Sequence, residues 1–187
     1  MKTTEIRIAG FGGQGVVLAG MVIGNAATLH DGKFVTLTQS FGPEARGTTC
    51  SVQLIVSDEP VLYPYVAKPD VLVVMSQDAH EKFGADLKPG GLLLYEEDLI
   101  QLAHLNHGTR TFGIPATRFA EELGRKLVLN MVMVGFVTAI AQLASPEAVR
   151  KAIRTSVPRG TEPLNLSAFE KGLKHGEAVL AGTPAAA

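Results

Sequence analysis

Two glycine-rich segments in the first sixty residues have the residue types and spacing to bind a phosphate-bearing ligand. The first, Gly10-Phe11-Gly12-Gly13-Gln14-Gly15, follows a short apolar run and leads into a longer one. In this G-x-G-x-x-G spacing the glycines allow a tight turn and a close approach of the backbone to a phosphate, and the next amides lie at the positive end of a helix. The backbone of Gly12, Gly13, Gln14 and Gly15 is therefore a candidate pyrophosphate contact. Alternatively, the glycines only allow tight packing of strand and helix.

The second segment is Gln39-Ser40-Phe41-Gly42-Pro43-Glu44-Ala45-Arg46-Gly47. Arg46 can pair with a phosphate through the planar fork of its guanidinium group, or instead with Glu44 or a carboxylate of another subunit. Glu44 is either a general acid or base or a solvated loop carboxylate. The candidate binding residues of this segment are Gly42, Glu44, Arg46 and Gly47. Asn130, near the start of a later helix, is either the helix N-cap or a further ligand contact.

Alternating strands and helices must position these segments. Apolar runs predict strands at residues 5–9, 34–38, 51–56, 71–75, 92–95 and 109–114. Helices are predicted at residues 13–30, 117–123, 128–144, 146–155 and 167–180, the last beginning with the capping-box spacing Ser167 to Glu170. This order predicts an α/β fold: a Rossmann-like, mostly parallel sheet with helices on both faces and a helical C-terminal third, formed by residues 1–187 as one domain.

The predicted sheet would bring the two glycine-rich segments together. Each follows one of the first two strands, and the carboxyl ends of neighbouring parallel strands form the crevice in which α/β folds bind ligands. The helices at residues 16–29 and 128–144 offer more apolar surface than one small sheet is expected to cover. The excess predicts contact with another subunit.

Composition excludes several functional classes. A net charge of −1 argues against nucleic acid or an anionic membrane as a partner. The single cysteine, Cys50, rules out an internal disulfide or an all-cysteine iron–sulfur or zinc site, and it suits a reducing cytoplasm. Cys50 is expected to be a small buried residue, with a reactive thiol as the alternative. His104 and His107 have no third ligand at a fixed spacing, so we expect no metal site.

A free-standing NAD(P)- or flavin-binding oxidoreductase is the alternative function that the first segment suggests. A dinucleotide site, however, usually has an acidic residue at the end of the second strand, where this sequence has Leu37-Thr38-Gln39-Ser40. No Lys or Arg lies between Arg7 and Lys33, so the first segment is not a Walker loop either.

Both segments together, with Gly20 and with Asn130-Met131-Val132, resemble the gamma subunits of 2-oxoacid:ferredoxin (acceptor) oxidoreductases. The order, spacing and total length agree, and the resemblance covers almost the entire chain. The chain looks most like the gamma subunits that serve 2-oxoglutarate, and those for pyruvate, branched-chain 2-oxoacids and indolepyruvate are close relatives. The string Gly42 to Gly47 is the most specific part of the resemblance, because glycine fingerprints alone are common.

The resemblance implies one subunit of a multi-chain enzyme. Such a complex decarboxylates a 2-oxoacid on thiamine diphosphate, passes electrons through iron–sulfur clusters to ferredoxin and releases an acyl-CoA. Thiamine diphosphate, Mg²⁺ and the clusters would belong to the alpha, beta and, in some complexes, delta subunits. This chain would contain no catalytic residue, would support assembly, and would help to hold coenzyme A at its crevice. The family's fused members are expected to have lysines near these loops; the first segment has none, so Arg46 is the stronger candidate.

Overall fold

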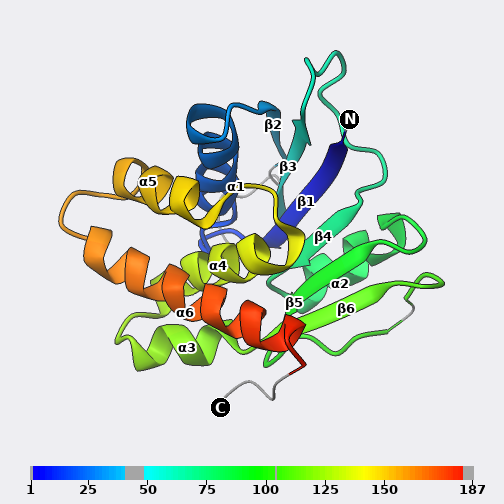
Figure 1. Cartoon of the computed structure of the whole chain (residues 1–187). Helices are drawn as coiled ribbons and strands as arrows, with labels where there is room; N and C mark the ends of the chain where they lie inside the picture. The colour runs from blue at the N-terminus through cyan, green and yellow to red at the C-terminus, as the bar shows by residue number, and fades with distance from the viewer. Residues whose placement is uncertain (1, 41–48, 104, 183–187) are drawn as a thin grey trace.

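The computed structural model describes residues 2–40, 49–103 and 105–182 (Figure 1). Its six strands are β1 (Thr3–Phe11), β2 (Phe34–Ser40), β3 (Thr49–Ser57), β4 (Val71–Val74), β5 (Leu92–Glu96) and β6 (Arg110–Ile114). Its α-helices are α1 (Val16–Asn25), α2 (Gln77–Phe83), α3 (Ala116–Glu122), α4 (Leu129–Ala141), α5 (Pro146–Ser156) and α6 (Glu162–Leu180). All six predicted strands are therefore present, each within two residues of its predicted bounds.

The strands form one sheet in the order β2-β3-β1-β4-β5-β6. Strands β1, β4, β5 and β6 pair in parallel, whereas β3 runs antiparallel to both β1 and β2. Strand β2 therefore points the same way as β1, but β3 lies between them, so the prediction of neighbouring parallel strands was wrong. Only residues 41–48 connect β2 to β3, and so short a connection suits an antiparallel pair because a parallel one needs a crossover of about a dozen residues.

Helices cover both faces of the sheet, as predicted, but unequally (Figure 1). Alternate residues of each strand face the two sides. Ile6 and Ile8 of β1 and Leu94 of β5 belong to the large core beneath α1, α4, α5 and α6. Leu72 and Val74 of β4 belong to a small core beneath α2. The mostly parallel α/β architecture is thus confirmed, with most of its helical mass on one face.

Helix α4 is the central element of the thick layer. Its residues from Leu129 to Ala139 are all buried. The helix is covered by the sheet on one side and by α3, α5 and α6 on the others. The chain's own C-terminal helices therefore cover the apolar surface of α4, so this surface is no longer an argument for contact with another subunit, and the expected subunit contact stays a prediction.

Three helix boundaries differ from prediction. The predicted helix 13–30 begins only at Val16, and its last turn, Ala26–His30, is π-helical. Helix α6 begins at Glu162 rather than at the expected capping box, with Pro163 in its first turn, and Ser167 lies inside the helix, where its hydroxyl donates to the Pro163 carbonyl. Helix α2 had no predicted range. The residue in the sequence that could have indicated the start of α2 is Ser76, whose hydroxyl caps the helix by accepting from the Ala79 amide.

Among the helices of the described residues, none combines the length and apolar character that a bilayer crossing requires.

Candidate functional site

The first glycine segment forms a tight turn between β1 and α1. The Gln14 amide donates to the Phe11 carbonyl at 3.1 Å. The Gln14 side chain closes the same turn, because its Oε1 accepts from the Phe11 amide at 2.7 Å while its Nε2 donates to the Met75 carbonyl at 2.8 Å. Gln14 therefore ties the end of β1 to the residue that follows β4, and both its backbone N–H and its side-chain amide are engaged within the protein, contrary to the expectation that it contacts a ligand.

Glycine is required where this turn enters α1. Gly15 is the N-cap residue, with φ of +74°, and no side chain of the described residues caps the helix. Gly13 has φ of +103°, and an added Cβ there would meet only open space. The first amides of a helix have no acceptor within the helix itself. The turn thus presents backbone N–H groups at the positive end of the α1 dipole, next to open space at Gly13, which suits an anionic oxygen.

Asn130 lies directly against this turn, 115 positions further along the chain. Its Nδ2 donates to the Gly15 carbonyl at 3.3 Å, and its Oδ1 accepts from the Met131 amide at 3.0 Å. It is only 3% exposed, and a Cβ on Gly15 would collide with its amide group. The N-cap of α4 is Val128, so the expectation that Asn130 is the N-cap was wrong. Asn130 instead joins the amino ends of α1 and α4.

The second segment reaches the same edge of the sheet. Ser40, the last residue of β2, pairs with Ser51, and Thr49, the first residue of β3, pairs with Phe11 of β1. The residues on either side of positions 41–48 therefore lie at the carboxyl end of β1, near the first turn. The four candidates Gly42, Glu44, Arg46 and Gly47 fall outside the described residues.

Cys50 is 8% exposed within β3, and burial raises the pKa of its thiol. A raised pKa keeps the sulfur protonated and weakly nucleophilic at neutral pH, which favours the structural role. His104 is outside the described residues. In residues 2–40, 49–103 and 105–182, no group of three or more His, Cys, Asp and Glu side chains could hold a metal ion.

Glu96 at the carboxyl end of β5 is a buried acid that sequence reasoning missed. It is 0% exposed. Its Oε2 accepts from the Thr117 amide at 2.6 Å and from the Thr117 hydroxyl at 2.8 Å, while its Oε1 accepts from the Asp98 amide at 3.0 Å. Burial raises its pKa, although these hydrogen bonds oppose the shift. The available signal was an acid directly after the run Leu92 to Tyr95 that predicts the strand.

The described site can therefore bind and orient an anion through backbone amides. It does not supply a set of cysteine ligands for an iron–sulfur cluster, because the sequence has only Cys50. Its described side chains at the turn, Gln14 and Asn130, have their amide groups engaged within the protein.

Comparison with known proteins assigns this arrangement to a family. The model for the pyruvate ferredoxin/flavodoxin oxidoreductase family matches residues 5–175, which includes both glycine segments and Asn130. The chain belongs to this family. Subunit KorC of 2-oxoglutarate synthase from Methanocaldococcus jannaschii is 48% identical over 170 residues, covering 90% of this chain and 91% of that one.

Solved structures agree. The gamma subunit of a keto/oxoacid ferredoxin oxidoreductase from Geobacter sulfurreducens superimposes with a TM-score of 0.83 at 36% identity, over 94% of this chain and 99% of that one. A 2-oxoglutarate:ferredoxin oxidoreductase from Magnetococcus marinus, solved with 2-oxoglutarate, coenzyme A and succinyl-CoA, has a TM-score of 0.87 at 24% identity and shares the fold. The superposition covers 98% of this chain but only 32% of that larger chain.

The chain is therefore a gamma-type oxidoreductase subunit of this family, as its sequence predicted, rather than a free-standing NAD(P)- or flavin-binding enzyme. The same fold occurs as a separate chain and as one part of a longer chain.

Proposed function

We propose that this chain is the gamma subunit of a complex that oxidatively decarboxylates 2-oxoglutarate to its acyl-CoA. The main support is the 48% identity to a 2-oxoglutarate synthase subunit along nearly the full length of both chains. Subunits of pyruvate synthase also match, at 33% identity over 159 residues, and pyruvate is the second candidate substrate. The greater identity to the 2-oxoglutarate subunits favours 2-oxoglutarate.

The division of labour follows from the residues of this chain. Alpha, beta and, in some complexes, delta subunits supply thiamine diphosphate, Mg²⁺ and the iron–sulfur clusters, because a single cysteine cannot ligate a cluster alone. Ferredoxin receives the electrons from those clusters. Residues 1–187 act as one domain of the complex in the cytoplasm, where the unpaired Cys50 stays reduced.

Coenzyme A binds at the carboxyl edge of the sheet in this proposal. The amides of Gly12, Gly13 and Gly15 face its pyrophosphate, which the space at Gly13 and the positive end of helix α1 support, while Gln14, whose amide donates to the Phe11 carbonyl, closes the turn. The residues Gly42, Glu44, Arg46 and Gly47 form the other side, with Arg46 as the cation. Asn130 positions the turn by holding the Gly15 carbonyl, and it contacts the ligand only through that turn.

Assembly and substrate are tested by one experiment. The chain is tagged and purified from its native cells, and the eluate is assayed for viologen reduction with 2-oxoglutarate, pyruvate and a branched-chain 2-oxoacid, each with and without coenzyme A. The proposal predicts co-purifying chains and CoA-dependent reduction with 2-oxoglutarate. Activity with pyruvate alone would change the substrate, and a solitary, inactive chain would contradict the subunit proposal.

The coenzyme A site needs its own test in that assembled enzyme. Arg46→Ala is expected to raise the apparent KM for coenzyme A by about tenfold and to leave the KM for the 2-oxoacid unchanged, since one charge-assisted phosphate contact is lost. Arg159→Ala, an exposed arginine in the link between α5 and α6, is the matched control. An unchanged KM in Arg46→Ala would remove Arg46 from the site.

A further inference from the structure

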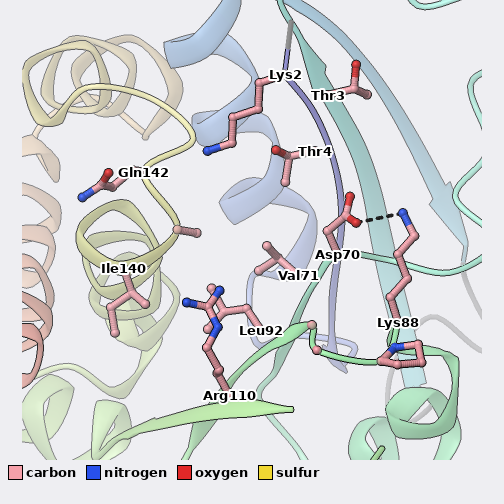
Figure 2. Close-up of a pocket in the computed structure, with 14 residues that line it drawn as sticks. Lys2, Thr3, Thr4, Asp70, Val71, Lys88, Leu92, Arg110, Ile140 and Gln142 are labelled. Atoms are coloured by element: carbon pink, nitrogen blue, oxygen red, sulfur yellow. Dashed lines mark hydrogen bonds and ion pairs between the residues drawn. The ribbon is translucent and has the colours of Figure 1, made fainter. Parts of the chain in front are cut away.

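A second cavity lies at the edge of the sheet opposite to the glycine turn. Its volume is about 420 Å³, and it is lined by the first residues of four strands: Thr3 of β1, Val71 of β4, Leu92 of β5 and Arg110 of β6. The carboxyl end of α4 forms its remaining wall (Figure 2). This volume lies within the range of small-molecule sites.

Two cations without an ionic partner among the described residues enter this cavity. Figure 2 shows the amino group of Lys2 and the guanidinium group of Arg110 extending from opposite sides into the same space. In the part of the chain that the structure describes, neither side chain forms a salt bridge. Both backbones are fixed, because the Lys2 amide donates to Asp58 at 3.0 Å and the Arg110 amide donates to Gly91 at 2.9 Å.

The acidic side chain of the lining, Asp70, is already paired with Lys88. Lys88 Nζ lies 2.8 Å from Asp70 and 3.0 Å from Glu5 and bridges the two carboxylates. In Figure 2 this bridge points away from the space between Lys2 and Arg110. The carboxyl end of α4 adds a partial negative charge of about half a unit, which is less than the charge of the two free cations. The residues that line the cavity therefore include three cations, Lys2, Lys88 and Arg110, and one carboxylate, Asp70, while the carboxylates of Glu5 and Asp58 next to the lining offset part of this positive charge.

The rest of the lining combines the polar side chains of Thr3, Thr4 and Gln142 with an apolar part. Val71 and Leu92 lie on the sheet side, and Ile140 and Ala141 lie on the helix side. A ligand that fits must therefore have an anionic group for Lys2 and Arg110 and a short apolar part for these four residues. The planar fork of Arg110 selects oxyanions, since phosphate and carboxylate oxygens can accept two parallel hydrogen bonds from it.

We propose that this cavity binds a small organic oxyanion, a phosphate monoester or a carboxylate with a short apolar chain, through Lys2 and Arg110. The site is separate from the glycine turn because it lies at the amino ends of the parallel strands rather than at their carboxyl ends. It is independent of the substrate and of the coenzyme A site proposed above.

The test is an amide NMR titration of the full-length chain with butyl phosphate, inorganic phosphate and butanoate. Saturable shifts are expected at the amides of Thr4, Gly90, Gly91 and Arg110. Butyl phosphate should bind about tenfold more tightly than inorganic phosphate, because its chain covers the apolar wall. If butanoate binds more tightly than butyl phosphate, the ligand is a carboxylate rather than a phosphate ester.

The variants Lys2→Gln and Arg110→Gln are combined, with Lys68→Gln and Arg159→Gln combined as a control of equal charge. All four side chains are exposed, so folding should be preserved. The first pair should weaken butyl phosphate binding by about tenfold or more, and the second pair should leave it unchanged. The proposal fails if none of the three probes shows saturable shifts at these amides. It also fails if both pairs weaken binding equally, since the attraction would then be non-specific.

The same pair of variants is purified with its partner subunits. If Lys2→Gln with Arg110→Gln releases a partner chain, and butyl phosphate shifts no amide of the wild-type chain, the cavity is a protein interface and the proposal is overturned. Retention of the partners together with the lost binding supports it.

Discussion

Gly15 is the residue on which the geometry of the candidate site depends most directly. Its φ of +74° and the collision of an added Cβ with Asn130 leave no room for another residue. Gly15→Ala is expected to lower the free energy of unfolding by about 2–4 kcal/mol, from backbone strain and overpacking together. Gly13→Ala should cost only about 1–2 kcal/mol, because φ is also positive there but the space is open. Urea denaturation measures both.

A double-mutant cycle with Asn130→Ala separates the two causes. Removing the Asn130 amide should relieve the collision, so Gly15→Ala should cost about 1–2 kcal/mol less in that background. Equal costs in both backgrounds would show that Asn130 does not restrict Gly15.

Glu96 should make stability depend on pH in an unusual direction. Its pKa in the folded protein is raised above the ordinary value of 4.5, so the folded protein keeps this proton at pH values where the unfolded chain has released it. Its contribution to the free energy of unfolding is therefore full at low pH. It is lost as the pH rises from about 4.5 through the raised pKa, by at most about 1.4 kcal/mol per pH unit.

Urea unfolding of Glu96→Gln between pH 4 and pH 8 tests this sign. The free energy of unfolding of Glu96→Gln should increase relative to that of the wild type as the pH rises. In Thr117→Val the free energy of unfolding should fall more steeply with rising pH than in the wild type, because this variant lacks a hydrogen bond that stabilises the ionised form of Glu96. Parallel pH profiles of the wild type and Glu96→Gln would contradict the raised pKa.

At the scale of the elements, helices α4 and α6 approach backbone to backbone. A Cβ on Gly172 would collide with the Val132 carbonyl, and a Cβ on Gly135 with the Phe169 carbonyl. Gly172→Ala is expected to lower the free energy of unfolding by about 3 kcal/mol or more, because the helices must separate and no flexible side chain can move aside. Ser167→Ala, at an exposed position of the same helix, should change stability by less than about 0.5 kcal/mol. Thermal and urea unfolding compare the two.

The elements also show what the sequence could reveal. Continuous apolar runs such as Val71 to Val74 predicted the strands correctly, because a central parallel strand is buried on both faces. The order of the strands could not be read from such runs, and β3 was not expected between β1 and β2. The start of α6 was missed because the capping-box spacing Ser167 to Glu170 indicated a later start, although Pro163 is well suited to a first helical turn.

The candidate site was predicted in part. The glycine spacing predicted the turn into α1, and the topology brings Asn130 to it. The engagement of the Gln14 side chain with Met75 depends on a contact across 61 positions and has no local signal. Burial of Glu96 likewise depends on hydrogen bonds from Thr117 of α3, for which the sequence signals only an acid at the end of an apolar run.

For the whole molecule, one shared core predicts one cooperative transition. Residues of the sheet and of α1, α3, α4, α5 and α6 belong to the same hydrophobic cluster. Far-UV circular dichroism follows mainly the helices, and labelling of the buried thiol of Cys50 follows the opening of the sheet. The two urea midpoints should coincide if residues 1–187 form one domain. Labelling of Cys50 at a lower urea concentration than the loss of helical signal would indicate that the β2–β3 edge opens separately.

The contact between α1 and α5 has a consequence for synthesis on the ribosome. The buried face of α1 includes Ala19 and Val22, and α5, which packs on it, includes Val149. Translation proceeds at about 5–20 residues per second, so α1 emerges from the ribosome roughly 6–26 s before α5. During that interval α5 is not yet present to cover the face of α1 on which it packs. Newly made chains are therefore expected to bind a chaperone at residues 16–25 until translation has passed α5.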